Sequence, residues 1–190
     1  MENFPDIDAF AELHPLSAAC REDFASIIQI QSLPKNTMLL DFGKKATTLF
    51  FIKKGLARAY YNRDGEEITY YFAIDGQFMC SVPSVFDGRP SFSAIQLIEQ
   101  SDIHCISYQD FDDCCARHHD LERAARKLFS LLLLLGLEDI ESLRFHSAHE
   151  RYLMVEKRHP GILNRCPLKY IASYIGTSQV SLSRIRAGIQ

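Results

Sequence analysis

The sequence PLKYIASYIGTSQVSLSRIRAG, residues 167–188, predicts two short helices joined by a tight turn. Ile171 and Ile175 lie one helical turn apart and share a face, and Ala172 is small enough for a second helix to cross closely. Gly176 follows where the backbone must turn, because glycine adopts left-handed conformations without a steric penalty. This stretch therefore indicates a helix–turn–helix.

The second of these helices has one apolar and one polar face. Ser178 is suited to cap it by accepting a hydrogen bond from a free backbone N–H, and Leu182 and Ile185 face inward. In a helix–turn–helix, residues near the start of the second helix meet base edges in the major groove. We therefore predict that double-stranded DNA is bound by Lys169, Thr177, Ser178, Gln179, Val180, Ser181, Arg184 and Arg186.

These residues differ in what they are able to contact. The Gln179 amide is suited to adenine, Val180 to a thymine methyl group, and Arg184 to guanine or a phosphate. The hydroxyl groups near the turn and the remaining basic residues are suited to phosphates. The alternatives are an ordinary two-helix corner of a globular core, or an Arg184 that pairs with Glu150 or Glu156.

Charge is distributed unevenly along the chain. The 190 residues carry a net charge of −3, but residues 144–190 hold eight Lys and Arg against two Asp and Glu, a balance of +6. The rest of the chain therefore carries −9. A basic segment on an acidic body favours phosphate binding at one end only. The 47% hydrophobic content indicates a globular protein.

Several protein classes are disfavoured. The start, MENFPDIDAF, lacks the basic residues and apolar run of a signal peptide, and the apolar run at residues 131–135 is too short to span a bilayer. We therefore expect a cytoplasmic protein without a membrane partner. The six cysteines show no CxxC pair and no zinc-like spacing, so we expect reduced thiols and no cofactor or metal site.

The first part of the chain is predicted to be helical over residues 7–31. Pro15 should divide this segment, because proline cannot donate a hydrogen bond inside a helix. The expected buried positions are Phe10, Leu13, Leu16, Phe24, Ile27, Ile28 and Ile30.

Between Leu33 and Tyr108 the sequence changes to short β-branched and aromatic runs separated by turn residues. Asp64-Gly65 is a strong hairpin signal. Runs at this spacing, with no intervening helix, predict an antiparallel barrel or jelly roll that either encloses a small ligand or has a filled core. The runs are MLLDFG, TLFFIKKG, LARAYYNRDG, EEITYYFAIDG and FSAIQLIEQSDIHCISY.

Helical periodicity returns after Tyr108. Apolar residues from 121 to 135 alternate by four and three, which is the spacing of a coiled-coil seam. We predict a homodimer interface formed by Leu121, Leu128, Leu132 and Leu135. Further leucines widen the apolar surface, so that one face of the helix is able to pack on the roll and the other on a partner. The alternative is a helix wholly inside its own core. Ser147 and Glu150 then form a capping-box pattern, which predicts a helix to about Arg158.

A β-roll, a long leucine-rich helix and a terminal helix–turn–helix, in this order, resemble the CRP/FNR family of bacterial transcription regulators. The ending IASYIGTSQVSLSRIRAG is similar to family members from Bacteroides-like bacteria. The residues that carry the resemblance are Leu49-Phe50-Phe51-Ile52, Gly55, the Tyr60–Gly65 turn, Asp75-Gly76-Gln77-Phe78, Ile171-Ala172, Gly176, Ser178 and Leu182-Ser183-Arg184-Ile185.

The resemblance implies an α+β fold. An N-terminal antiparallel β-roll of the cyclic nucleotide-binding type, the jelly roll, would sense a signal. A long helix would form the dimer, and a winged-helix-like domain would enter DNA. We place the β-roll sensor with its flanking helices at residues 1–143 and the helix–turn–helix domain at residues 144–190. RNA polymerase is a further partner that the resemblance implies.

The sequence departs from cyclic nucleotide-binding members at two points. Those members carry a Gly-Glu pair that holds the ribose hydroxyl and, shortly after it, an Arg that holds the cyclic phosphate. Here the corresponding places read Cys80-Ser81 and Ser91-Phe92. A phosphate in an apolar pocket needs a charged partner. We therefore expect a small-molecule effector other than cyclic AMP, in a pocket formed by Phe78, Met79, Cys80, Ser81, Ser91 and Phe92.

Enzymatic functions fit less well. A metal-dependent jelly-roll enzyme needs a His-x-His pair and a Glu, and the only histidine between Leu33 and Tyr108 is His104. His118 and His119, beside Cys114 and Cys115, are interpreted as a solvated helix start. We therefore expect no catalytic residues and predict a homodimeric DNA-binding transcription regulator. The alternative is a ligand-binding roll whose C-terminal helices contact other proteins, and the basic balance of residues 144–190 favours DNA.

Overall fold

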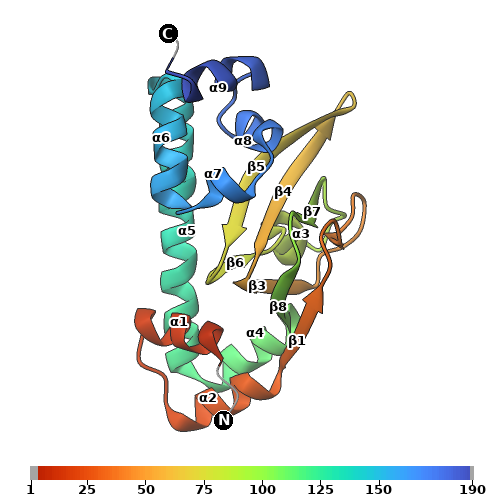
Figure 1. Cartoon of the computed structure of the whole chain (residues 1–190). Coiled ribbons are helices and arrows are strands. Elements are labelled where there is room, and N and C mark those ends of the chain that lie inside the picture. Colours follow the sequence, from red (N-terminus) through yellow and green to blue (C-terminus); the bar gives the residue numbers. More distant parts are fainter. Residues whose placement is uncertain (1–3, 189–190) are drawn as a thin grey trace.

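A long helix runs beside a roll of antiparallel strands in the computed structural model, which describes residues 4–188 (Figure 1). Shorter helices gather around both ends of this long helix, three near its start and four near its end. The long helix is α5 (His119–Phe145), its start is surrounded by α1 (Pro5–Leu13), α2 (Ala18–Ser26) and α4 (Tyr108–Arg117), and its end by α6 (Ala148–Arg158), α7 (Ile162–Arg165), α8 (Leu168–Tyr174) and α9 (Gln179–Arg186).

Two four-stranded antiparallel sheets form the roll, as the jelly-roll pattern of the sequence predicts. The first sheet has the order β1 (Ile28–Leu33), β8 (Ser101–Ser107), β3 (Thr48–Lys54) and β6 (Gln77–Met79). The second has the order β2 (Met38–Leu40), β7 (Ser93–Leu97), β4 (Leu56–Arg63) and β5 (Glu66–Ile74). A short helix, α3 (Val82–Asp87), connects the two sheets between β6 and β7.

The hairpin predicted at Asp64-Gly65 joins β4 to β5. Arg63 pairs directly with Glu66, so the connection has only two residues. Both have positive φ, 54° at Asp64 and 88° at Gly65, which is the geometry of a type I′ turn. The turn sequence therefore fixes the register of the two longest strands.

The start of β4 pairs with the end of β5, and both faces of the sheet are buried at this place. Ala57, Ala59 and Ala73 belong to the core inside the roll. Leu56, Phe72 and Ile74 belong instead to a second apolar cluster, which they share with the C-terminal helices. A strand that is apolar at every position is typical of a sheet covered on both sides. The C-terminal helices are thus packed against the outer face of the roll.

The helical prediction for residues 7–31 is only partly correct. Pro15 separates α1 from α2, as expected, but the chain from Ile28 onward is strand β1. Ile30 pairs with His104 on β8, and its side chain is 45% exposed rather than buried. The alternation Ile28-Gln29-Ile30-Gln31 has the period of a strand, and the cost of an unpaired β8 edge outweighs the local helix preference.

The predicted capping box is present at the start of α6, where the Ser147 hydroxyl and the Glu150 carboxylate each accept a backbone N–H. Helix α7 was not predicted. The expected domain boundary after residue 143 falls inside α5.

No strand follows β8 in the described part of the chain, so the strands of a wing are not among residues 108–188. Within the same part, no helix combines the length and apolar character needed to cross a bilayer.

Candidate functional site

The predicted helix–turn–helix corresponds to α8, a four-residue turn and α9. Ile171, Ala172, Ile175 and Leu182 are buried in the second apolar cluster. Gly176 has a φ of 65°, the left-handed conformation that the turn needs. The Ser178 hydroxyl accepts a hydrogen bond from the Ser181 backbone N–H at 3.1 Å. Each of these local features agrees with the sequence prediction.

The face of α9 that points away from this cluster is open to solvent. Gln179, Ser181, Arg184 and Arg186 are exposed, and Val180 keeps 65% of its surface. Thr177 is half-buried in the turn and Ser178 is exposed. Lys169 is exposed on α8, with its ammonium nitrogen 4.7 Å from the centre of the Tyr170 ring. All eight residues predicted to bind DNA thus lie in α8, α9 and the turn between them.

The alternative in which Arg184 pairs with Glu150 or Glu156 is not seen among the described residues. Glu150 caps α6 through Ser147. Glu156 instead accepts the backbone N–H of Gly161 at 2.8 Å. No acidic residue occurs between residues 167 and 188. The outer face of α9 is therefore free of negative side chains of its own.

A polar contact fixes α8 to the edge of strand β5. The Ser173 hydroxyl accepts the Thr69 backbone N–H at 2.9 Å and donates to the Glu67 carbonyl at 3.0 Å. The side chain therefore satisfies two backbone groups of an edge strand that has no further strand beside it. The two hydrogen bonds hold the helix at a defined place along the strand.

Two buried or half-buried arginines join the roll to the C-terminal helices. Arg58 of β4 is 1% exposed and lies between the rings of Tyr60 and Tyr170, with its guanidinium carbon 3.9 and 3.5 Å from their centres. Its charge is paired with Glu67 at 2.5 Å. The interface thus places a charged side chain in an apolar setting, and stacking and ion pairing together compensate its lost hydration.

The second arginine, Arg165 of α7, binds three groups of the roll. It donates to the Gly55 carbonyl at 2.7 Å and forms ion pairs with Glu99 and Asp75. Burial alone would raise the pKa of Asp75, but hydrogen bonds from Arg165 and from the Gly55 backbone N–H keep this pKa below its ordinary value. Gly55 is required here, because a Cβ atom would lie 2.1 Å from the Ser101 hydroxyl oxygen.

Sequence reasoning did not identify Arg58, Arg165 or Ser173. One signal was available for Arg58, since a single charged residue lies inside the apolar run LARAYY. A charge in the middle of a buried strand indicates either a ligand contact or an internal ion pair. Arg165 and Ser173 carry no comparable signal, because both lie in short polar segments whose partners are distant in the sequence.

A cavity of about 600 Å³ lies between the roll and α5. Its roll side includes three residues of the expected effector pocket, Phe78, Met79 and Cys80. Three tyrosines that were not predicted, Tyr61, Tyr70 and Tyr71, also line it. Its helix side is formed mainly by leucines, namely Leu128, Leu132 and Leu135.

The polar groups of this cavity are uncharged except at the end formed by Asp139 and Arg158. Burial raises the pKa of Tyr70, Tyr71 and Cys80 to about 12, so their hydroxyl and thiol groups stay protonated. Arg158 lies at the edge and already pairs with Asp139 and Glu138. The cavity therefore suits a mostly apolar ligand with a few hydrogen-bonding groups, because its lining offers no unpaired cation.

The remaining expected effector residues are not in the cavity. Ser81 and Ser91 are buried and their hydroxyl oxygens are 2.8 Å apart. Ser91 also donates to the Ser93 carbonyl at 2.7 Å. Phe92 is 76% exposed and also lies outside the cavity. The small hydroxyl groups bond to one another, and the loop leaves the bulky ring outside.

The predicted dimer seam also faces the roll. Leu121 is fully buried within the protomer and belongs to the core, so it is not available to a partner. Leu128, Leu132 and Leu135 line the cavity described above. The four–three spacing of leucines correctly identifies an apolar face of α5, but Leu121 is buried inside its own protomer, where α5 packs against α1 and α4.

A different face of α5 is uncovered. Leu133, Leu137 and Ile140 repeat the four–three spacing and are 66%, 55% and 53% exposed. Leu134 and Leu143, on either side of this stripe, are each 56% exposed. Exposed apolar side chains in such number along one helix are typical of an interface with another protein.

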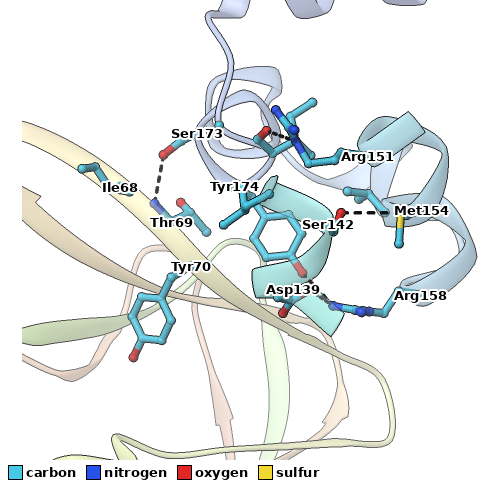
Figure 2. Close-up of a pocket in the computed structure, with 14 residues that line it drawn as sticks. Ile68, Thr69, Tyr70, Asp139, Ser142, Arg151, Met154, Arg158, Ser173 and Tyr174 are labelled. Atoms are coloured by element: carbon cyan, nitrogen blue, oxygen red, sulfur yellow. Dashed lines mark hydrogen bonds and ion pairs between the residues drawn. The ribbon is translucent and has the colours of Figure 1, made fainter. Parts of the chain in front are cut away.

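A second cavity, of about 330 Å³, lies where α5, α6, α8 and β5 meet (Figure 2). Arg151 donates to the Ile175 carbonyl at 2.7 Å on one side, and the Tyr174 hydroxyl lies 3.4 Å from Arg158 on the other. Figure 2 shows the Tyr174 ring between strand β5 and the Asp139 turn of α5. Tyr70, Asp139, Arg158 and Tyr174 line both cavities.

Comparison with known proteins places this geometry among cyclic nucleotide-binding-like folds. Residues 30–118 match the model of the cyclic nucleotide-binding domain. The chain is similar in structure to FixK2 from Bradyrhizobium japonicum, with 18% identity, a TM-score of 0.70, and coverage of 86% of this chain and 84% of that one. No curated protein sequence matches the chain.

Two further solved structures resemble it along nearly its whole length. A putative transcriptional regulator of the crp/fnr family from Eubacterium rectale is 18% identical, with a TM-score of 0.69 and coverage of 92% and 84%. The catabolite activator protein of Thermus thermophilus is also 18% identical, with a TM-score of 0.58 and coverage of 95% and 86%. The chain therefore has a cyclic nucleotide-binding-like domain within a CRP-like fold.

Proposed function

We propose that this chain, with its cyclic nucleotide-binding-like roll and CRP-like arrangement, is a homodimeric, non-enzymatic transcription regulator that binds double-stranded DNA through α9. The observation that carries the proposal is the outer face of α9, a helix that follows a tight turn. Gln179 and Val180 are exposed in its first turn, and Arg184 is exposed in its last. Side chains in this arrangement are able to reach base edges in the major groove.

Electrostatics supports a DNA partner for this end of the molecule. The segment from residue 144 onward carries a balance of +6, and residues 167–188 hold no acid that would repel a phosphate. Ser178 and Thr177 lie at the start of α9, where hydroxyl and backbone N–H groups are able to bind phosphate oxygens. Lys169 and Arg186 add positive charge on either side.

The second copy of the chain is proposed to pack on the uncovered face of α5 formed by Leu133, Leu137 and Ile140. A parallel pair of α5 helices would carry the two α9 helices on the same side of the dimer. Recognition of two half-sites about 34 Å apart, one turn of B-DNA, then follows from the two-fold axis. The proposed dimer also removes apolar surface that is costly to leave in water.

The effector is proposed to bind in the larger cavity and not to be cyclic AMP. A cyclic nucleotide brings a negative phosphate, and the place of its usual arginine is held by Ser91, which is buried and bonded to Ser81. The lining of neutral tyrosines and leucines favours an uncharged or largely apolar molecule instead. Tyr174 of α8 belongs to the same lining, so a bound molecule would contact the helix–turn–helix directly.

The test is selection of bound sequences from a random double-stranded DNA library by the full-length protein. The expected result is an inverted repeat whose half-sites are centred about 10 base pairs apart. Loss of this enrichment in an Arg184→Glu variant whose circular dichroism is unchanged would support the proposal that α9 contacts the DNA bases. Failure to enrich any sequence at low salt, with or without cell extract as a source of effector, would refute the proposal.

A further inference from the structure

Three side chains of the types that bind transition metals meet where α2 crosses the junction of α4 and α5. Cys20, His118 and Asp120 each offer one ligand atom, and these atoms lie within 4.8 Å of one another. Cys20 comes from α2, about 100 residues before the other two in the sequence. The fold rather than the sequence spacing brings this donor set together, which explains why no zinc-like motif is visible.

A fourth side chain orients the imidazole. The His118 Nε2 lies 2.8 Å from the Asp23 carboxylate, which is on the same helix as Cys20. A metal-binding histidine usually donates its other ring N–H to a carboxylate, because this contact fixes the tautomer and the ring orientation. With Nε2 held by Asp23, the Nδ1 atom is the one left for a metal.

We propose that Cys20, His118 and Asp120 form a zinc site at this helix junction, with water as the fourth ligand. A thiolate, an imidazole and a carboxylate together suit Zn²⁺, whereas Mg²⁺ and Ca²⁺ require oxygen ligands alone. Tetrahedral zinc with bonds of about 2.0–2.3 Å separates its ligand atoms by roughly 3.3–3.8 Å. The three ligand atoms lie within 4.8 Å of one another, so they need to approach by at most about 1.5 Å.

Access and chemistry are consistent with this site. His118 and Asp120 are only half-buried, so water and the ion reach them, while Cys20 is fully buried beneath them. Zinc binding replaces the thiol proton of Cys20, which is released to solvent, and forms one sulfur–zinc bond. The neighbouring histidine, His119, is exposed and is not part of the cluster.

The site would add a connection between α2 and the start of α5. Asp120 already accepts the Ser17 backbone N–H, the first residue before α2, at 2.7 Å. Cys20 is one helical turn further along α2, between Ser17 and the Asp23 that contacts His118, so a metal bridge would add a third point of attachment to the two already present. Zinc is therefore expected to raise the thermal stability of the N-terminal helices.

The experiment uses tag-free full-length protein that has been stripped of metal by a chelator. We expect one zinc ion per chain after equilibration and dialysis, measured by elemental mass spectrometry. Substitution with Co²⁺ should produce a thiolate-to-cobalt charge-transfer band. Cys20→Ser should abolish this band, and Asp23→Asn should weaken zinc binding by about 10- to 100-fold through the lost support of His118.

His119→Gln is the matched control, since it removes a neighbouring exposed histidine outside the cluster, and it should bind zinc as the wild type does. If Cys20→Ser fails to fold, the cobalt spectrum of the wild type and zinc binding by His118→Gln still decide the question. The proposal is wrong if the stripped wild type takes up no stoichiometric zinc, if cobalt binds without a thiolate band, or if His119→Gln loses binding as Cys20→Ser does. Because these measurements need neither DNA nor an effector, they are independent of the proposed regulatory function.

Discussion

The guanidinium carbon of Arg58 lies 3.5 Å from the centre of the Tyr170 ring, so a buried cation of the roll is stacked on the first turn of α8. The opposite face of the guanidinium contacts Tyr60 at 3.9 Å. The contact lies at the junction between the roll and the helix–turn–helix, and it therefore offers a local probe of how firmly the two parts are held together.

Replacement of Tyr170 by leucine should destabilise the protein more than replacement by phenylalanine. Phenylalanine keeps the negative ring face that attracts Arg58, whereas leucine keeps only apolar volume. The expected difference is about 0.5–2 kcal/mol in the free energy of unfolding, which is the range of a desolvated cation–π contact. Urea denaturation of the two variants measures it, and equal stabilities would show that the ring face contributes nothing.

Gln179 and Lys169 should have different roles in DNA binding, the first in contacting bases and the second in contacting phosphates. Gln179→Ala should relax base preference at one operator position, at a cost of about 1–3 kcal/mol there. Lys169→Ala should weaken binding to all sequences and reduce the salt dependence by about one phosphate contact. Selection from random DNA followed by anisotropy titration over several salt concentrations makes both measurements. An unchanged consensus and affinity for Gln179→Ala would show that α9 does not read bases through this residue.

A charge placed on the uncovered face of α5 should produce monomers. Leu137→Glu would bury a carboxylate in the proposed dimer, and an unpaired buried charge is too costly for a stable interface. Phe92→Glu is the control, because it changes a still more exposed apolar residue on a loop of the roll. Sedimentation equilibrium at micromolar concentration should show dimers for the wild type and the control only. A monomeric wild type would argue against the dimer itself.

Cyclic AMP should not bind at physiological concentration. The roll offers the Ser81 and Ser91 hydroxyl groups, already bonded to each other at 2.8 Å, where a carboxylate and an arginine would be needed. Calorimetric titration of the full-length protein with cyclic AMP should therefore give no binding heat. A dissociation constant in the micromolar range or tighter would mean that another cation, such as Arg158 at the cavity edge, neutralises the phosphate.

Stability should fall between neutral and mildly acidic pH because of His159. Burial, followed by the nearby charge of Arg158, lowers the pKa of His159 from 6.5 to about 4. The unfolded chain therefore binds the extra proton first, so stability is lost as the pH falls below the unfolded value and levels off below the folded one. This residue alone should cost about 2 kcal/mol between pH 7 and pH 5.

His159→Phe tests this contribution, because it keeps an aromatic ring beside Phe72 and Tyr174 but removes the titrating group. The difference in unfolding free energy between the two pH values should shrink by the amount above. His149→Gln, an exposed histidine of α6, should leave that difference as in the wild type. A His159→Phe variant with an unaltered pH dependence would indicate that other groups cause it.

The parts of the fold that local chemistry dictates could be predicted from the sequence. The Asp64-Gly65 turn, the Ser147–Glu150 capping box and the left-handed Gly176 depend on residues that are neighbours in the chain. Most of the predicted strand runs are also found, but the run from Phe92 to Tyr108 divides into β7 and β8, and neither β6 nor the intervening helix α3 was expected.

Prediction failed where the deciding partner is distant in the sequence. Ile28–Gln31 has helical neighbours but becomes a strand because β8 offers it an unpaired edge. The leucine seam of α5 was correctly seen as apolar, yet periodicity does not say whether the roll or a second chain covers it. The same limit applies to Arg165, whose partners Gly55, Asp75 and Glu99 are brought together only by the finished roll.

The residues shared by the two cavities link binding in one cavity to the placement of the helices around the other. Tyr70, Asp139, Arg158 and Tyr174 border the space beside the roll and the space beneath α8 at once. If a small molecule and the partner of the helical end each bind better to one placement of Tyr174 than to another, then each changes the affinity of the other by the same factor. The effector could thus be found from the opposite direction, as whatever small molecule the protein holds more tightly, or less tightly, once its operator is bound.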